Sequence, residues 1–98
     1  MASAPKKLSA ATVRKKLARL DGWRRQGKAI VKEFVLSGFT GATRFIAKIA
    51  PIANKMDHHP DVKLYRYKRV KIILTTHSAG GITQNDFDLA AKIDSLPS

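Results

Sequence analysis

The stretch VKIILTTHSAGGITQND, residues 70–86, decides the fold of this chain. Its first half alternates like a strand, and the positions that share one face are Val70, Ile72, Leu74 and Thr76. Two glycines then interrupt the chain, and Thr83 with Asp86 three residues later is typical of a capping box that opens a helix. We therefore predict a strand over residues 70–77, a turn over 78–81 and a helix after Thr83.

The longest helix is predicted upstream of this stretch, over residues 39–56. Apolar residues recur there at spacings of three and four, which indicates a broad face that packs on the core. Ser37 or Thr40 is expected to be its N-cap, and Pro51 inside it predicts a kink. The helix must end by His58, because a proline follows two residues later.

The same signals predict the other elements: a helix over residues 10–20, a hairpin of strands over 23–25 and 29–36, and a strand over 62–67. Ser9 is the expected N-cap of the first helix, and Gly22 lies in its expected C-cap region. Gly27 supplies the turn of the hairpin. The order is α-β-β-α-β-β-α, which predicts an α+β fold with the helices on one face of the sheet.

The composition indicates one small domain. The chain has 98 residues, 44% of them hydrophobic, and no cysteine, which excludes disulfides and thiolate chemistry. No apolar run is long enough to span a bilayer, so no membrane partner is expected. We expect a flexible basic N-terminus over residues 1–7, a single domain over 8–98, and a cytoplasmic location, with the nucleus as the alternative.

The net charge of +12 is concentrated near the N-terminus. Residues 1–32 carry ten basic side chains against one acid, Asp21, a field that would attract phosphates, nucleic acid or an acidic protein. A solubilising surface is the favoured explanation, because no arginine-rich recognition helix or aromatic stacking motif accompanies the charge. The alternative is a module that binds nucleic acid or an acidic protein. It would be favoured if the protein bound DNA or RNA in a salt-dependent way and lost this binding when Arg14, Lys15 and Lys16 were neutralised.

All three histidines fall within twenty residues, at His58, His59 and His77. Imidazole is the side chain whose ordinary pKa lies nearest neutrality, so this clustering predicts proton chemistry. The alternatives stay open for each group: one ring of the pair caps the helix while the other is solvated, and His77 bonds at a sheet edge. For Asp86, helix capping and a role beside a histidine are compatible.

A metal site is the main rival for these residues, since three histidines and a carboxylate resemble a zinc site. Neighbouring histidines seldom both turn onto one ion, so we expect no metal here. The chain also lacks a phosphate-binding glycine motif, and we expect no cofactor.

Several motifs together resemble the pterin-4a-carbinolamine dehydratase family, and they are Asp57-His58-His59-Pro60, Thr75-Thr76-His77, Gly80-Gly81-Ile82-Thr83 and Asp86. The resemblance extends from about Leu8 to Asp94. It implies a four-stranded antiparallel sheet with three helices on one side, in a homodimer or homotetramer. It also implies dehydration of 4a-hydroxytetrahydrobiopterin to quinonoid dihydrobiopterin, which recycles the pterin used by an aromatic amino acid hydroxylase. That reaction needs neither a metal nor a redox cofactor.

The resemblance also assigns residues. It implies that His58, His59 and His77 are the catalytic histidines and Asp86 the motif aspartate, with Asp57 as a candidate for supporting them. The pterin-contacting segments would be His58-His59-Pro60 and Thr76-His77-Ser78-Ala79. As a hypothesis, His58 and His77 are the acid and the base, His59 holds the pterin, and Asp86 orients a histidine.

Two positions depart from the family pattern. Asn54 stands where family members often carry an acid, so a carboxylate role is lost there, and Pro51 lies where a helix former is expected. The alternative to an enzyme is a basic binding module, or a dimerisation cofactor for a nucleic-acid-binding or acidic protein partner.

Overall fold

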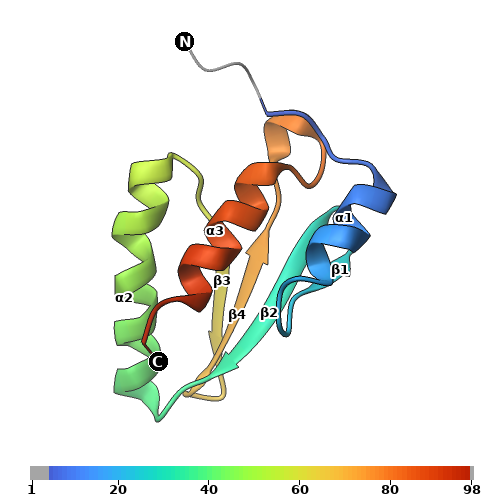
Figure 1. The fold of residues 1–98 in the computed structure, drawn as a ribbon. Helices are drawn as coiled ribbons and strands as arrows, with labels where there is room; N and C mark the ends of the chain where they lie inside the picture. Colours follow the sequence, from blue (N-terminus) through green and yellow to red (C-terminus); the bar gives the residue numbers. More distant parts are fainter. Residues whose placement is uncertain (1–4, 98) are drawn as a thin grey trace.

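The computed structural model describes residues 5–97 as two layers, with three α-helices on one side of a four-stranded antiparallel sheet (Figure 1). The elements in chain order are α1 (Ala10–Leu17), β1 (Arg24–Gln26), β2 (Ala29–Val35), α2 (Phe39–Met56), β3 (Asp61–Tyr65), β4 (Arg69–Leu74), the 3₁₀ turn η1 (His77–Ala79) and α3 (Gln84–Asp94). This order confirms the predicted α+β fold. None of the described helices is long and apolar enough to cross a membrane. The predicted flexible segment 1–7 lies partly outside the described residues, which begin at Pro5.

The sheet has the strand order β1-β2-β4-β3, so β2 and β4 are its central strands. The predicted alternation in β4 is confirmed, because Val70, Ile72 and Leu74 have no exposed surface while their neighbours are only half-buried. Ile30 on β2 pairs with Leu74 and faces the same core. Thr76 continues this buried face beyond the end of β4, which places a polar side chain beneath the helices.

Helix α2 has the predicted bounds, and its buried residues Ala42, Phe45, Ile49 and Ala53 follow the helical period. The predicted caps Ser37 and Thr40 are wrong: Gly38 occupies the N-cap position and makes no side-chain bond to the first turn. The helix runs through Pro51 without interruption. Pro51 is exposed, and so is Ala47, whose carbonyl would accept from an amide at position 51 in a helix without proline.

Helix α1 is shorter than the predicted 10–20. Ser9 is its N-cap, as expected, and accepts a bond from the Thr12 amide. The helix ends at Leu17 because the next amides bond three residues back, from Arg19 to Lys16 and from Leu20 to Leu17. Gly22, the expected C-cap residue, lies beyond this tightened turn.

The ends of the C-terminal strands also differ from prediction. Strand β4 ends at Leu74 instead of residue 77, because Thr76 pairs with Gly81 and the chain between them closes into the turn η1. Strand β3 ends at Tyr65 instead of residue 67, because Arg66 and Tyr67 take left-handed backbone angles. His77 therefore begins a turn and does not end a strand.

Candidate active site

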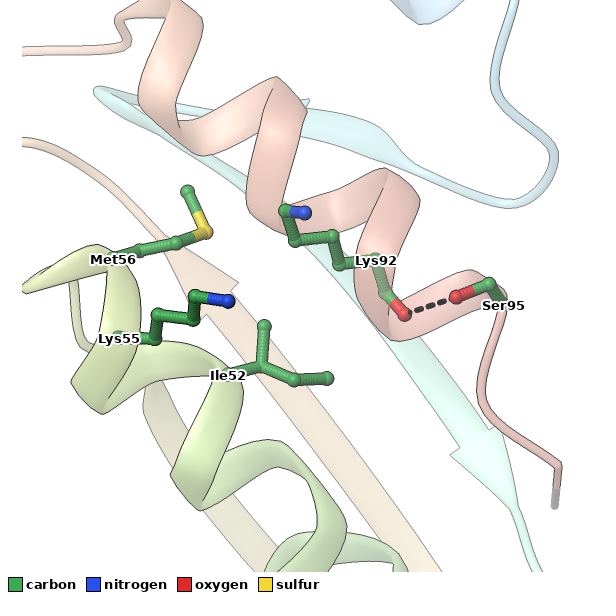
Figure 2. Close-up of a pocket in the computed structure, with 5 residues that line it drawn as sticks. All are labelled: Ile52, Lys55, Met56, Lys92 and Ser95. Atoms are coloured by element: carbon green, nitrogen blue, oxygen red, sulfur yellow. Dashed lines mark hydrogen bonds between the residues drawn. The ribbon is translucent and has the colours of Figure 1, made fainter.

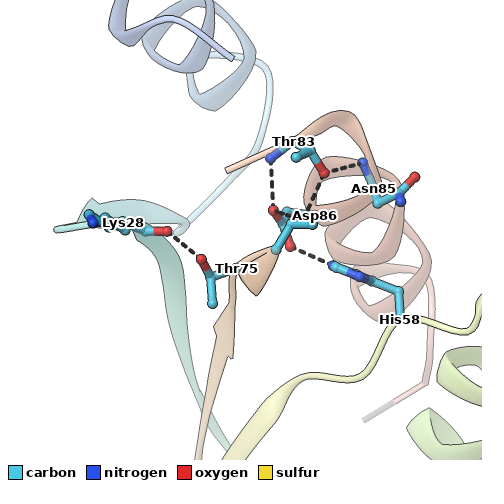
Figure 3. Close-up of polar contacts among 7 residues, drawn as sticks. Lys28, His58, Thr75, Thr83, Asn85 and Asp86 are labelled. Atoms are coloured by element: carbon cyan, nitrogen blue, oxygen red, sulfur yellow. Dashed lines mark hydrogen bonds and ion pairs between the residues drawn. The ribbon is translucent and has the colours of Figure 1, made fainter. Parts of the chain in front are cut away.

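The centre of the candidate site is the carboxylate of Asp86, which has no exposed surface (Figure 3). One oxygen, Oδ1, lies 2.6 Å from Nε2 of His58. The other, Oδ2, accepts bonds from the Thr83 amide at 2.9 Å and from the Thr76 hydroxyl at 3.0 Å. A buried carboxylate is costly unless donors surround it, and here three donors do so.

The predicted capping box of α3 is confirmed in the same contacts. Thr83 caps the helix, and Asp86, its third residue, bonds back to the Thr83 amide. The alternative reading of Asp86 as a helix cap is therefore correct. It does not exclude the second role, because the cap uses Oδ2 and leaves Oδ1 to His58.

Two buried threonine hydroxyls extend the network in one direction. The Thr76 and Thr83 hydroxyl oxygens are 2.8 Å apart, and Thr83 Oγ1 accepts the Asn85 amide. Since Thr76 gives its one proton to Asp86, the Thr83 hydroxyl must donate to Thr76. Every hydroxyl then has one donor and one acceptor role, and Asp86 is held rigidly.

His58 is positioned by the end of α2. The helix ends at Met56 and is followed by the C-cap residue Asp57, whose backbone is left-handed (φ 50°). The His58 amide donates to the carbonyl of Ala53 at 3.1 Å. The imidazole is only 10% exposed and turns toward α3. A carboxylate can only accept, so Nε2 of His58 carries the proton of this bond and Nδ1 of the neutral ring is left as an acceptor.

His59 points elsewhere. Its ring is exposed, and Nε2 lies 3.0 Å from Oδ1 of Asn54, one turn back on α2. Asn54 thus supplies a neutral oxygen at the position where the family pattern favours an acid. Pro60 is half-buried, and Asp57, predicted to support the histidines, is exposed.

His77 lies beside a hollow of about 350 Å³ that is also lined by Lys28, Ala29, Thr75, Gly80 and Gly81. The Thr75 hydroxyl bonds to the Lys28 carbonyl, which ties the hairpin turn to the end of β4 (Figure 3). Ser78 is exposed and Ala79 half-buried in the turn that follows. His58 and His59 are not among the residues that line this hollow.

The structure thus joins His58, Asp86 and Thr76, sets His77 one residue after Thr76, and bonds His59 to Asn54. Sequence reasoning missed the Thr83–Thr76 hydroxyl chain, although both threonines stood in the quoted motifs. It also missed Lys28, which the hairpin register brings beside Thr75. No cluster of three His, Cys, Asp or Glu side chains within residues 5–97 is arranged to hold a metal ion.

A larger hollow, of about 490 Å³, lies between α2 and α3, and no histidine lines it (Figure 2). Its lining residues are Ile52, Lys55, Met56, Lys92 and Ser95. Its only ionisable lining side chains are two lysines, and it contains no histidine and no carboxylate. Size alone therefore does not identify the reactive site.

The family described as "Pterin 4 alpha carbinolamine dehydratase" matches residues 6–96. A protein of Sulfurisphaera tokodaii, provisionally named as a pterin-4-alpha-carbinolamine dehydratase, is 47% identical over 91 residues, which cover 93% of this chain and 97% of the relative. A Roseiflexus protein with the same provisional name is 46% identical over 92% of this chain and 96% of its own.

Solved structures that resemble this chain also carry pterin dehydratase in their descriptions. A Brucella melitensis protein described as a transcriptional coactivator/pterin dehydratase superposes with a TM-score of 0.86 at 35% identity, over 92% of this chain and 97% of that one. A pterin dehydratase-like RuBisCO assembly factor of the alpha-carboxysome reaches 0.60 at 26% identity, over 76% and 87%. With nearly its full length matched in sequence and in fold, the chain belongs to the pterin-4-alpha-carbinolamine dehydratase family.

Proposed function

We propose that this protein removes water from 4a-hydroxytetrahydrobiopterin and releases quinonoid dihydrobiopterin. The observation that carries the proposal is the family match over residues 6–96. The bond between His58 and buried Asp86 gives that match a chemical basis, because it holds an imidazole in one orientation.

The reaction requires two proton transfers and no change in oxidation level. The C4a–O bond breaks while the hydroxyl takes a proton and leaves as water. The N5–H proton is removed, and its electron pair forms the C4a=N5 double bond. One acid and one base within reach of the pterin are therefore sufficient.

His58 is the proposed base. Asp86 accepts a hydrogen bond from Nε2–H of the ring, so the lone pair on Nδ1 is available to take the N5 proton. The negative charge of Asp86 also stabilises the imidazolium that forms, as a buried aspartate does behind other catalytic histidines.

His77 is the proposed acid, and His59 a binding residue. His77 is exposed beside a hollow whose lining also includes Gly80 and Gly81, where a flat ring can approach the backbone closely. His59 is tied to Asn54 and has no carboxylate partner in the described structure, which suits a contact with substrate better than proton transfer. Pro60, Ser78 and Ala79 remain the proposed neighbours of the pterin.

The test is turnover of freshly generated 4a-hydroxytetrahydrobiopterin, followed by the absorbance of the quinonoid product. His58→Ala and His77→Ala should each lower the enzymatic rate at least about tenfold. His59→Ala should raise KM more than it lowers kcat, because it removes a binding contact. Full activity in both the His58 and His77 variants, with circular dichroism unchanged, would refute the mechanism.

We also propose that the protein works as a homodimer or homotetramer in the cytoplasm, or alternatively in the nucleus, and recycles pterin for an aromatic amino acid hydroxylase. The names of the two solved relatives, one a coactivator and one an assembly factor, support a second candidate: a partner-binding protein without turnover. The same absorbance assay separates the two, since the second candidate predicts no rate above the uncatalysed dehydration.

A further inference from the structure

Half of the net charge lies in residues 14–28. This segment has seven cations and one acid, a net +6, whereas the other 83 residues have twelve cations and six acids, also +6. The cations are Arg14, Lys15, Lys16, Arg19, Arg24, Arg25 and Lys28. A basic field this dense attracts anions by long-range steering.

The fold brings two of these cations, Arg14 and Arg25, to one groove at an edge of the molecule. Arg24 and Lys28 line other hollows. Helix α1 lies beside the edge strand β1 (Figure 1), and a groove of about 260 Å³ runs between them. Arg14 lines it from the helix and Arg25 from the strand, over a floor that includes Val13 and Leu17. Arg25 Nε bonds to the Gly27 carbonyl, and the rest of its guanidinium remains available.

No internal acid accounts for these charges. The ion pairs within residues 5–97 are Lys32–Asp94, His58–Asp86 and Arg69–Glu33, and none includes a cation of residues 14–28. The α1 dipole favours Arg14, Lys15 and Lys16, which lie in its last turn. It does not account for Arg24 and Arg25 on a strand, where both side chains are exposed.

We propose that the groove between α1 and β1 binds the phosphodiester backbone of double-stranded nucleic acid. Arginine presents paired donors that match phosphate oxygens, and Arg14 and Arg25 flank the groove from opposite sides. The groove shares no lining residue with the hollow beside His77, and its proposed role does not depend on the dehydratase activity.

Two competing anions fit the surface less well. A membrane surface would need exposed apolar anchors, and the exposed large hydrophobic side chains of the described chain, Val35, Phe39, Val62 and Tyr67, all lie outside it. Single strands are held largely by stacking on aromatic rings. The one aromatic residue of residues 10–28, Trp23, is buried, so duplex phosphates are favoured and no base is read.

The experiment measures fluorescence anisotropy of a labelled mixed-sequence duplex across a salt series. Arg14→Gln/Arg25→Gln is compared with Arg44→Gln/Lys48→Gln, which alters a similar small groove on α2. Both double variants lower the formal charge from +12 by two, so overall charge is matched. Arg14→Gln alone serves as a second variant that leaves the Arg25–Gly27 bond intact.

The α1–β1 double variant should bind roughly tenfold or more weakly near 0.1 M salt, and its slope of log K against log salt should be about 2 smaller. Arg14→Gln should lower the slope by about 1. The α2 control should bind like the unaltered protein. The proposal would be overturned if both double variants bound the duplex equally weakly, or if the unaltered protein bound the matching single strand more tightly. It would also be overturned if poly-glutamate competed as well as the duplex, or if no duplex bound at about 50 mM salt.

Discussion

The Nε2 atom of His58 lies 2.6 Å from Oδ1 of Asp86, across 28 positions of sequence and between two helices. The aspartate is fully buried and the histidine nearly so. The other carboxylate oxygen accepts two donors, and an ionised carboxylate has no proton to give, so His58 Nε2–H donates to Oδ1.

Replacing Asp86 with Asn should reverse the tautomer of His58. The amide oxygen is needed at the Oδ2 position, where the Thr83 amide and Thr76 hydroxyl donate, so the NH₂ group must face His58. Nε2 then becomes an acceptor and the proton moves to Nδ1. Long-range ¹H–¹⁵N NMR of the imidazole measures this directly, and an Nε2–H signal retained in the variant would contradict it. If the proposed mechanism holds, turnover falls between about tenfold and 10⁴-fold.

Thr76→Val should destabilise the fold by about 1–3 kcal/mol, because it removes a hydroxyl that both donates and accepts in a buried network. Asp86 loses one donor and the Thr83 hydroxyl loses its acceptor. Urea unfolding measures the difference. Thr76→Ser is the matched control, since it keeps the hydroxyl and should lose much less stability. Unchanged stability in Thr76→Val, or a loss in Thr76→Ser as large as that in Thr76→Val, would contradict a stabilising role of the hydroxyl network.

The open face of the sheet, opposite the helices, carries a phenol–carboxylate pair that shifts two pKa values. The Tyr65 hydroxyl donates to Glu33, which lowers the pKa of Glu33 from 4.5, and a bond from Arg69 lowers it further. The same contact, aided by burial, raises the pKa of Tyr65 above 10.0. Glu33→Gln should return the Tyr65 pKa toward 10.0, as read from the pH dependence of absorbance at 295 nm.

The sign for stability follows from the lowered pKa of Glu33. Its ionised form contributes stability that is present above pH 4.5 and is lost as the pH falls through the lower folded value. Tyr65→Phe should shrink this acid-dependent loss, because the largest cause of the shift is removed. An unchanged pH dependence of unfolding would show that Arg69 alone holds the carboxylate.

Asp94 links α3 to the other layer, and its removal should be costly. One oxygen accepts from Trp23 Nε1 at 2.9 Å and the other from Lys32 at 2.8 Å. Asp94→Ala leaves the buried indole without its acceptor and should cost about 1–3 kcal/mol, whereas Asp94→Asn keeps an acceptor and should cost less. Denaturant unfolding followed by Trp23 fluorescence tests both, since the chain has one tryptophan.

The elements that the sequence predicted best are those with a complete local pattern. Helix α2 has the predicted bounds because eighteen residues of helical periodicity end at a break that a following proline requires. The capping box at Thr83 and the turn at Gly27 were also predicted from patterns of a few neighbouring residues. Strand β4 was predicted too long because its end depends on the pairing of Thr76 with Gly81, which no alternation reveals.

The candidate site, too, could be predicted from the sequence only in part. The histidine motifs and Asp86 could be named from sequence, since their residue types and spacing resemble those of the family. The partner of each ring could not. His59 is bonded to Asn54, the position where the resemblance implied only a loss, and His77 has Lys28 beside its hollow.

Sequence by itself therefore determined which elements form, their order and the set of groups able to transfer protons, because periodicity, caps and residue chemistry act over a few neighbours. Only the tertiary structure decided that His58 faces Asp86 while His59 does not, and that two threonine hydroxyls complete the buried network. The physical reason is that a buried carboxylate must collect its donors from whatever elements the packing brings together. That packing depends on the whole core and not on any one segment.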